Sequence, residues 1–320
     1  MIEKRRLGRT ELEVTAMGLG AYQITDEFGV PAAEAEKILG FAIRSGINYI
    51  DTAQMYGFGE SEALIGQALR RHGASGVYIG DKIGYVDRGV TRAQGDEAYQ
   101  DPAALKRMIK HSFWLLQRDY VDIFMIHEPN NAGWWKLNYD TGDSAVTEVL
   151  EELKREGLIG AIGLGCWNSE TLARLVETGR FDVALNAGGI SLLARPMFKR
   201  LIPAAQKQDV GVIVGGVLGQ GFAAELLSKD RKLAHAIANE ADEARKTHGQ
   251  KLLKLYDLAD EAGLSMLEMS MRYVLSFPEI HCHIPGARLE AHVRENLALS
   301  MKGPLPRDVV ARIIEISGGA

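Results

Sequence analysis

The sequence is poor in cysteine, in long apolar runs and in excess charge of one sign. Its 320 residues include two cysteines, Cys166 and Cys282, which excludes a disulfide-rich scaffold and suits a reducing compartment. No stretch approaches the roughly 18 uninterrupted apolar residues of a membrane-spanning helix. The first residues, MIEKRRLGRTELEV, lack the apolar segment of a signal peptide. We therefore expect a cytoplasmic protein with no membrane partner.

The charge balance is mild, with a formal net charge of −5 and basic residues scattered along the chain. A nucleic-acid-binding surface needs clustered lysine and arginine, so we expect no nucleic-acid partner. The apolar fraction is 46% and the charged fraction 25%, typical of a globular domain with a large core. We expect a monomer or a small homo-oligomer that acts on small molecules.

What the chain does have is a regular alternation of short apolar runs with longer amphipathic stretches. Val, Ile, Leu and Gly dominate the short runs, as expected of parallel strands buried on both faces. Eight strand–helix units in about 300 residues favour an α/β fold, a single (β/α)8 TIM barrel spanning residues 1–320. The predicted strands are Ala16–Gly20, Asn48–Asp51, Val77–Asp81, Val121–Ile126, Ile159–Leu164, Val183–Asn186, Gly211–Val214 and His281–Ile284. The predicted helices between them are Pro31–Ser45, Asp101–Gln117, Asp143–Glu156, Ser169–Glu177, Pro196–Lys207, Leu252–Ala262, Ser265–Ser276 and Leu289–Leu299.

Two segments fall outside this repeat. Arg5–Leu7 and Leu12–Val14 flank the turn-like GRTE, which predicts an N-terminal hairpin closing the barrel bottom. Gly219–Leu264 is too long for one connection, so we expect extra helices between strands seven and eight.

Ionisable residues end three consecutive predicted strands, where a barrel places its active site. The runs INYIDTAQMYG, VYIGDKIG and VDIFMIHEPN put Asp51, Lys82 and His127 there, and Tyr56 follows in the loop above Asp51. Each residue alone fits a cap or a structural role. Their coincidence on neighbouring strands favours a catalytic group.

These four residue types suit proton transfer to a carbonyl oxygen. A free tyrosine has a pKa of about 10 and is a poor acid–base near neutrality. A nearby ammonium favours the phenolate and lowers that pKa. Lys82 supplies such a charge, Asp51 can keep Lys82 protonated, and His127 can hydrogen-bond the same oxygen. We therefore expect Tyr56 to be an activated proton donor and acceptor.

The segments IDTAQMYGFGESE, DKIG and MIHEPN resemble the aldo-keto reductase superfamily. The likeness runs from GRTELEVTAMGLGAY to IPGARLEAHVRENLA, nearly the whole chain. It implies an NAD(P)-dependent oxidoreductase whose catalytic tetrad is Asp51, Tyr56, Lys82 and His127. Tyr56 would be the general acid in carbonyl reduction and the general base in alcohol oxidation. Members bind the nicotinamide cofactor on the barrel without a Rossmann domain, which agrees with the lack of a GxGxxG fingerprint here.

The same resemblance implies a cofactor site. Tyr22, Asp51 and Asn168 would contact the cofactor, while glycines let the backbone approach the phosphates. Arg288 favours NADP(H), although NAD(H) remains open because the family often has Gln or Arg where this chain has His292. The loop after strand seven would wrap the pyrophosphate, and the segment after strand eight would bind the adenosine end: Gly216, Val217, Leu218 and Gly219, then Gly286, Arg288, His292, Glu295 and Asn296.

The nicotinamide side departs from the common pattern. Gly165-Cys166 stands where many members have Ser-Asn, Ala187 replaces a usual Gln, and Gly215 replaces a stacking Tyr. These departures resemble the aldose 1-dehydrogenase subgroup, which includes fucose and galactose dehydrogenases. In that pattern Asn168 would replace the missing carboxamide partner.

Aromatic residues in the predicted upper loops suit a sugar or other small carbonyl substrate. Packing or subunit contacts remain open for each tryptophan, and Glu128 fits either a substrate contact or a cap. The residues expected to bind substrate are Tyr22, Tyr56, His127, Trp134, Trp135 and Trp167.

Three alternatives remain at this point. Reduction of an aldehyde or ketone competes with oxidation of a sugar hemiacetal to a lactone. Lys82 could form a Schiff base in a lyase or aldolase, or the chain could be a non-catalytic cofactor-binding regulatory subunit.

The run HCH at residues 281–283 has the residue types of a metal site. Adjacent strand residues face opposite sides of the sheet, so we expect no metal.

Overall fold

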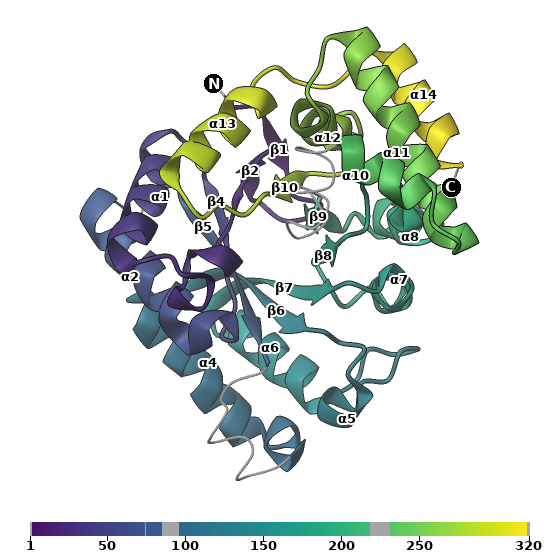
Figure 1. Cartoon of the computed structure of the whole chain (residues 1–320). Coiled ribbons are helices and arrows are strands. Elements are labelled where there is room, and N and C mark those ends of the chain that lie inside the picture. Colours follow the sequence, from purple (N-terminus) through teal and green to yellow (C-terminus); the bar gives the residue numbers. More distant parts are fainter. Residues whose placement is uncertain (1, 74, 85–95, 218–230, 319–320) are drawn as a thin grey trace.

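The computed structural model describes residues 2–73, 75–84, 96–217 and 231–318, and its centre is a barrel of eight parallel strands (Figure 1). The strands pair in sequence order, and bridges from Met17 to His283 and from Gly20 to Gly286 join the first strand to the last. The predicted (β/α)8 barrel is confirmed. Its strands are β3 (Leu19–Gly20), β4 (Tyr49–Asp51), β5 (Tyr78–Ile83), β6 (Val121–His127), β7 (Ile159–Cys166), β8 (Val183–Ala187), β9 (Gly211–Gly215) and β10 (Cys282–Ile284).

Helices surround the barrel, and their starts follow capping signals in the sequence. The side chains of Asp101, Ser144 and Asn168 accept hydrogen bonds from backbone N–H groups of the first turns of α4, α6 and α7. No described helix is long and apolar enough to cross a membrane. The helices are α1 (Ala32–Arg44), α2 (Glu60–His72), α4 (Pro102–Leu116), α5 (Ala132–Trp135), α6 (Ala145–Arg155), α7 (Ser169–Glu177), α8 (Leu201–Gln208), α10 (Arg231–Ala238), α11 (Glu243–Ala262), α12 (Met266–Leu275), α13 (Glu290–Ser300) and α14 (Arg307–Ser317). Short 3₁₀ turns are η1 (Tyr22–Ile24), η2 (Asp26–Phe28), η3 (Tyr56–Gly59), η4 (Asp96–Gln100) and η5 (Pro196–Phe198).

The extra helices predicted between strands seven and eight are present as α10 and α11. α11 begins well before the predicted Leu252, because its polar first turns carry no apolar period, although Asp242 caps them. The helix predicted over Pro196–Lys207 is wrong as a single element. Arg200 has a φ of −141°, which separates η5 from α8, and its guanidinium pairs with Glu177 of α7.

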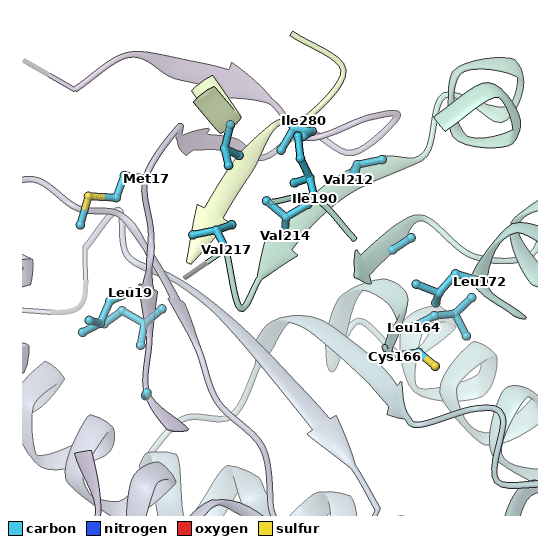
Figure 2. Close-up of a cluster of buried hydrophobic side chains, with 14 of the residues drawn as sticks. Met17, Leu19, Leu164, Cys166, Leu172, Ile190, Val212, Val214, Val217 and Ile280 are labelled. Carbon is cyan, nitrogen blue, oxygen red and sulfur yellow. The ribbon is translucent and has the colours of Figure 1, made fainter. Parts of the chain in front are cut away.

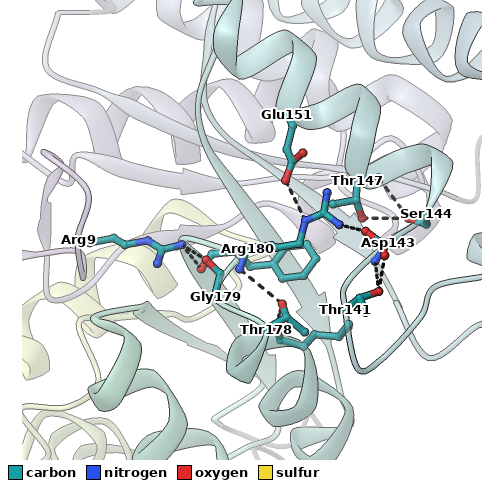
Figure 3. A network of polar contacts seen from close by, with 11 residues as sticks. Arg9, Thr141, Asp143, Ser144, Thr147, Glu151, Thr178, Gly179 and Arg180 are labelled. Carbon is teal, nitrogen blue, oxygen red and sulfur yellow. Dashed lines mark hydrogen bonds and ion pairs between the residues drawn. The ribbon is translucent and has the colours of Figure 1, made fainter.

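The predicted hairpin closes the barrel bottom with strands β1 (Lys4–Arg6) and β2 (Glu13–Thr15). Arg9 in its turn donates to Asp182 Oδ1 at 2.9 Å and to the carbonyl oxygen of Gly179 at 3.0 Å. Arg180 beside them pairs with Glu151 of α6 at 2.9 Å and with Asp143 (Figure 3). These contacts attach the hairpin and α6 to the segment that leads into β8.

Alternation along the strands makes two cores and also decides which side chains at the strand ends point into the barrel. Outward-facing residues such as Leu164 and Val212 pack against the helices (Figure 2). A second cluster fills the barrel interior and includes Tyr49, Ile123 and Met125. Side chains on one face of a strand recur every two residues. Residues further along these strands that keep the same spacing therefore also point into the barrel. The inward positions at the upper ends of β4, β5 and β6 are Asp51, Lys82 and His127.

Candidate active site

Asp51, Lys82 and Tyr56 meet at the mouth of the barrel. Lys82 Nζ lies 2.6 Å from Asp51 Oδ1, 2.6 Å from the carbonyl oxygen of Thr52 and 3.2 Å from the Tyr56 hydroxyl. An ammonium has three N–H donors, so all three have an oxygen partner. The side chain of Lys82 is 1% exposed, and such a buried charge requires this kind of complete pairing.

A strained turn brings Tyr56 back over Lys82. After β4, Gly57 and Phe58 in η3 adopt left-handed backbone angles, with φ of 59° and 53°. The Tyr56 ring centre then lies 4.8 Å from Lys82 Nζ and 6.0 Å from the His127 ring centre. Tyr22 packs on its other side at 4.9 Å. This turn joins a loop tyrosine to two strand-end residues.

Burial dominates the protonation states of the two residues nearest the reacting position. Desolvation raises the pKa of Tyr56 to about 12, outweighing the opposite effect of Lys82. The expectation that Lys82 lowers this pKa below its usual value is therefore wrong for the cofactor-free site. Burial, with a smaller effect of Lys82, holds the pKa of His127 well below its usual range. Near neutral pH, Tyr56 is a phenol and His127 a neutral imidazole.

The Asp51–Lys82 pair holds its positive charge on the lysine. Burial alone would lower the pKa of Lys82, but Asp51 and Tyr56 outweigh it and the pKa is raised. Burial raises the pKa of Asp51, and Lys82 acts against that rise. Lys82 is thus a fixed ammonium beside the Tyr56 hydroxyl.

Gly165 leaves the space that Lys82 needs. His127 on β6 pairs in register with Gly165 on β7. A Cβ atom at Gly165 would lie 3.0 Å from Lys82 Cδ, closer than ordinary packing allows. A side chain at Gly165 would therefore press on the aliphatic part of Lys82 in this structure.

A cavity of about 790 Å³ extends from this group along the barrel mouth, within the size range of ligand and cofactor sites. Most of the predicted site residues line it together, from the ends of β4–β9 to the first turns of α13. Those on its wall are Tyr22, Asp51, Tyr56, Lys82, His127, Trp167, Gly216, Val217, Gly286, Arg288, His292, Glu295 and Asn296.

Three predicted site residues lie elsewhere, and two fall outside the described residues. Asn168 is exposed and caps α7 by accepting from the Thr171 N–H at 2.9 Å. Trp135 is fully buried and donates its indole N–H to the His127 carbonyl oxygen at 3.0 Å. Trp134 stacks on Tyr99 at 5.0 Å. None of the three lines the cavity, so these contacts give each a structural role, while the predicted cofactor role of Asn168 and substrate roles of Trp134 and Trp135 stay predictions. Leu218 and Gly219 lie outside the described residues.

The departures on the nicotinamide side share one surface. Trp167, 47% exposed, rests on the glycines that end β8 and β9. A Cβ at Gly188 would lie 2.9 Å from its ring, and one at Gly216 would lie 3.3 Å from it. Gly216 also has a φ of 65°, a conformation that favours glycine. Trp167 from the β7 loop thus packs beside the residue that follows Gly215 at the end of β9.

Other cavity residues carry no motif of their own, such as Gln23, Met55 and Cys166. Each of the three adjoins a predicted site residue, and Cys166 also belongs to a departure from the family pattern. Their place on the wall depends on how the strand ends and loops fold over the barrel.

The far end of the cavity has mixed charge. The Arg288 guanidinium lies 5.3 Å from the Phe28 ring centre. The first turn of α13 already has an anion, because Glu34 accepts from the Glu290 N–H at 3.0 Å, a hydrogen bond that lowers the pKa of Glu34. A phosphate at this first turn would compete with the Glu34 carboxylate for the backbone N–H.

The HCH segment has structural partners. His281 Nδ1 accepts from the Val212 N–H at 2.9 Å, and His283 lies 3.4 Å from the Ser300 hydroxyl. Cys282 faces the barrel interior. Within the described residues, no group of three His, Cys, Asp or Glu side chains is arranged to hold a metal ion.

Comparison with known proteins agrees with this geometry. The Aldo/keto reductase family model matches residues 16–317. The chain belongs to this family. As a member it is an oxidoreductase that uses NAD(P) and acts on carbonyl compounds.

Curated relatives of this aldo-keto reductase include dehydrogenases. It is 26% identical to pyridoxal 4-dehydrogenase of Microbacterium luteolum, covering 92% of each chain. It is 27% identical to L-galactose dehydrogenase of Arabidopsis thaliana, covering 93% of this chain and 88% of that one. The predicted likeness to aldose dehydrogenases is therefore confirmed. A holo structure of an aldo-keto reductase from Bacillus halodurans has a TM-score of 0.79 at 23% identity, covering 100% and 98% of the two chains, and has the same fold.

Proposed function

We propose that this chain transfers hydride between a nicotinamide cofactor and a small carbonyl compound or sugar hemiacetal, with Tyr56 as general acid and base. One observation carries the proposal. The Tyr56 hydroxyl lies 3.2 Å from a fully paired lysine ammonium, in a cavity that His127 also lines. Such a group moves a proton at an oxygen and stabilises the charge left behind.

The cavity fits the cofactor in shape and chemistry. It runs from the Tyr56 end to Arg288 and Asn296, and Gly216 and Gly286 line the wall between them. When bound, NAD(P)(H) supplies or accepts the hydride. Gly216 and Val217 would face its phosphates, and the α13 segment would hold the adenosine. Arg288 favours NADP(H), whereas Glu34 opposes a 2′-phosphate, so NAD(H) remains the alternative.

Tyr56 gives its proton to the substrate oxygen in reduction. The phenolate then lies beside the Lys82 ammonium, which Asp51 holds at 2.6 Å, so the new negative charge is stabilised at once. Neutral His127 can donate to the same oxygen while leaving its charge unchanged. In oxidation the phenolate takes the hydroxyl proton back, and the same residues act in reverse.

The two directions share one site. Relatives named for the oxidation of pyridoxal and L-galactose, together with the aldose-dehydrogenase-like pattern, favour a hemiacetal substrate oxidised to a lactone. Aldehyde or ketone reduction is the second candidate, since the proton-transfer group serves either direction.

A Schiff-base lyase is disfavoured by the state of Lys82. Its three donors already have oxygen partners and its pKa is raised, so it lacks the free lone pair that imine formation needs. Borohydride trapping of a carbonyl compound on Lys82 would support the lyase. Tight cofactor binding without turnover of any carbonyl or sugar would instead favour a regulatory subunit.

The decisive test is Tyr56→Phe, which removes the hydroxyl group and keeps the ring. We expect kcat to fall by about 10²–10⁴ while cofactor affinity, measured by fluorescence titration, stays unchanged. Tyr120→Phe, at the opposite end of the barrel, is the matched control and should keep full activity. Wild-type turnover by Tyr56→Phe would refute the assignment.

A further inference from the structure

Glu128 occupies an unusual place directly after His127. It is the first residue beyond β6 and has a φ of 49°, a left-handed conformation that is unfavourable for a non-glycine residue. Its N–H donates to the Gly165 carbonyl oxygen at 2.7 Å, and its own carbonyl accepts from the Asn131 N–H at 2.9 Å. These bonds fix the backbone so that the Glu128 side chain lines the cavity.

Burial raises the pKa of Glu128, while the Cys166 thiol, the Trp167 backbone N–H and the charge of Lys82 act against that rise. Glu128 Oε2 lies 3.4 Å from Cys166 Sγ, and that thiol is a neutral donor because burial raises its pKa to about 12. Asn130 Oδ1 also lies 3.2 Å from Cys166 Sγ, and one S–H serves one acceptor at a time. Glu128 forms no ion pair with the described residues. Beyond the Cys166 thiol and the Trp167 backbone N–H, the carboxylate keeps acceptor positions for a ligand.

Other carboxylates on the cavity wall are already committed or lie elsewhere. Asp51 is bound to Lys82, and Glu295 belongs to α13 at the Arg288 end. Glu128 is the wall carboxylate adjacent to His127 on the chain and open to a ligand at the reacting end. A carboxylate accepts hydrogen bonds and donates none, so it suits hydroxyl groups and repels anions.

We propose that Glu128 is a specificity-determining residue that accepts hydrogen bonds from hydroxyl groups next to the reacting carbon. The inference rests on the proposed function and narrows its substrate to neutral polyhydroxylated carbonyl compounds or their hemiacetals. A substrate without such hydroxyls leaves the half-buried carboxylate poorly solvated, and sites built for a substrate hydroxyl discriminate strongly against its absence. A substrate carboxylate or phosphate in the same place meets charge repulsion.

The test compares three aldehydes in the reductive direction: glyceraldehyde, propanal and glyceraldehyde 3-phosphate. We expect the wild type to prefer glyceraldehyde to propanal in kcat/KM by at least about tenfold. Glu128→Gln should reduce this preference about tenfold or more and improve relative use of the phosphorylated aldehyde. Glu148→Gln, the same charge change on the exposed face of α6, should leave all ratios unchanged.

Glu128→Gly keeps the inference testable if the Gln variant folds poorly. Glycine accepts the left-handed conformation without strain, so this variant should fold well and lose the same preference. Turnover with unchanged ratios in both variants would overturn the role of Glu128 and leave the proposed function intact. No turnover of any aldehyde or aldose by the wild type would overturn the proposed function, and the role of Glu128 with it.

Discussion

Replacing Lys82 with methionine removes one partner of a buried ion pair and leaves the other in place. Methionine fills most of the lysine volume, so the loss is chiefly electrostatic. Asp51 is 2% exposed, and its remaining side-chain contact is the Tyr49 hydroxyl at 3.5 Å. Breaking a buried pair in this way costs roughly 3–5 kcal/mol. The free energy of unfolding should fall by that amount near neutral pH.

The loss of stability in Lys82→Met should also increase as pH rises. Burial raises the pKa of Asp51 and Lys82 opposes that rise, so the variant lifts this pKa further. An aspartate in the unfolded chain titrates near pH 4. Above that pH the folded variant keeps a proton that the unfolded chain releases, so stability falls as pH rises, by up to about 1.4 kcal/mol per unit. The loss ends once pH exceeds the folded pKa.

Asp51→Asn combined with Lys82→Met is the matched control, because it removes the buried carboxyl group as well. Urea unfolding followed by far-UV circular dichroism at pH 5, 6, 7 and 8 measures both proteins. We expect the single variant to lose stability relative to the double variant as pH rises, by about 3 kcal/mol at pH 7. Parallel pH curves for the two proteins would refute the account of the pair.

Three further outcomes follow from the same contacts. Gly165→Ala should displace Lys82 by a few tenths of an ångström, lower kcat by roughly tenfold or more and destabilise by about 1–3 kcal/mol; unchanged kinetics and urea unfolding would show that the lysine adapts freely. Asp81→Asn should stabilise the protein above pH 6 by about 1–3 kcal/mol. Asp81 and Glu62 are buried carboxyl groups that share a hydrogen bond, and the pKa of each is raised, so the stability that their protonated forms provide is lost as pH rises from about 4. A difference in urea unfolding that does not grow with pH would contradict this. Arg288→Ala should weaken NADP(H) more than NAD(H) in fluorescence titrations, and an equal loss would show that Arg288 contacts the adenine instead of the 2′-phosphate.

The fold was accessible from the sequence because its signals are local. Eight apolar runs of similar length, separated by capped amphipathic segments, leave few arrangements other than a barrel. α2 and α14 were missed because nothing in their flanks marked a start as clearly as Asp101-Pro102 marks α4. The end of η5 and the start of α8 at Arg200 were missed, because the non-helical backbone there coincides with a contact to Glu177 of α7 that no local pattern records.

The site residues divide in the same way. Asp51, Lys82 and His127 were predictable because strand parity and strand ends are written in the local pattern. The position of Trp135 and Asn168 outside the cavity wall was not predictable, because an aromatic or amide residue in an upper loop can face either way. The indole of Trp135 turned toward the His127 carbonyl, and the Asn168 amide capped α7.

The sequence by itself determined the barrel, the proton-transfer group and the edge on which that group lies, since each depends on residue order and side-chain alternation. Only the tertiary structure decided the protonation of Tyr56, the packing of Trp167 on Gly188 and Gly216, and the exposure of Glu128 to the cavity. These properties depend on desolvation and contacts between chain segments that fold together from distant positions. The sequence records which groups are available, while their energies are set by what surrounds them after folding.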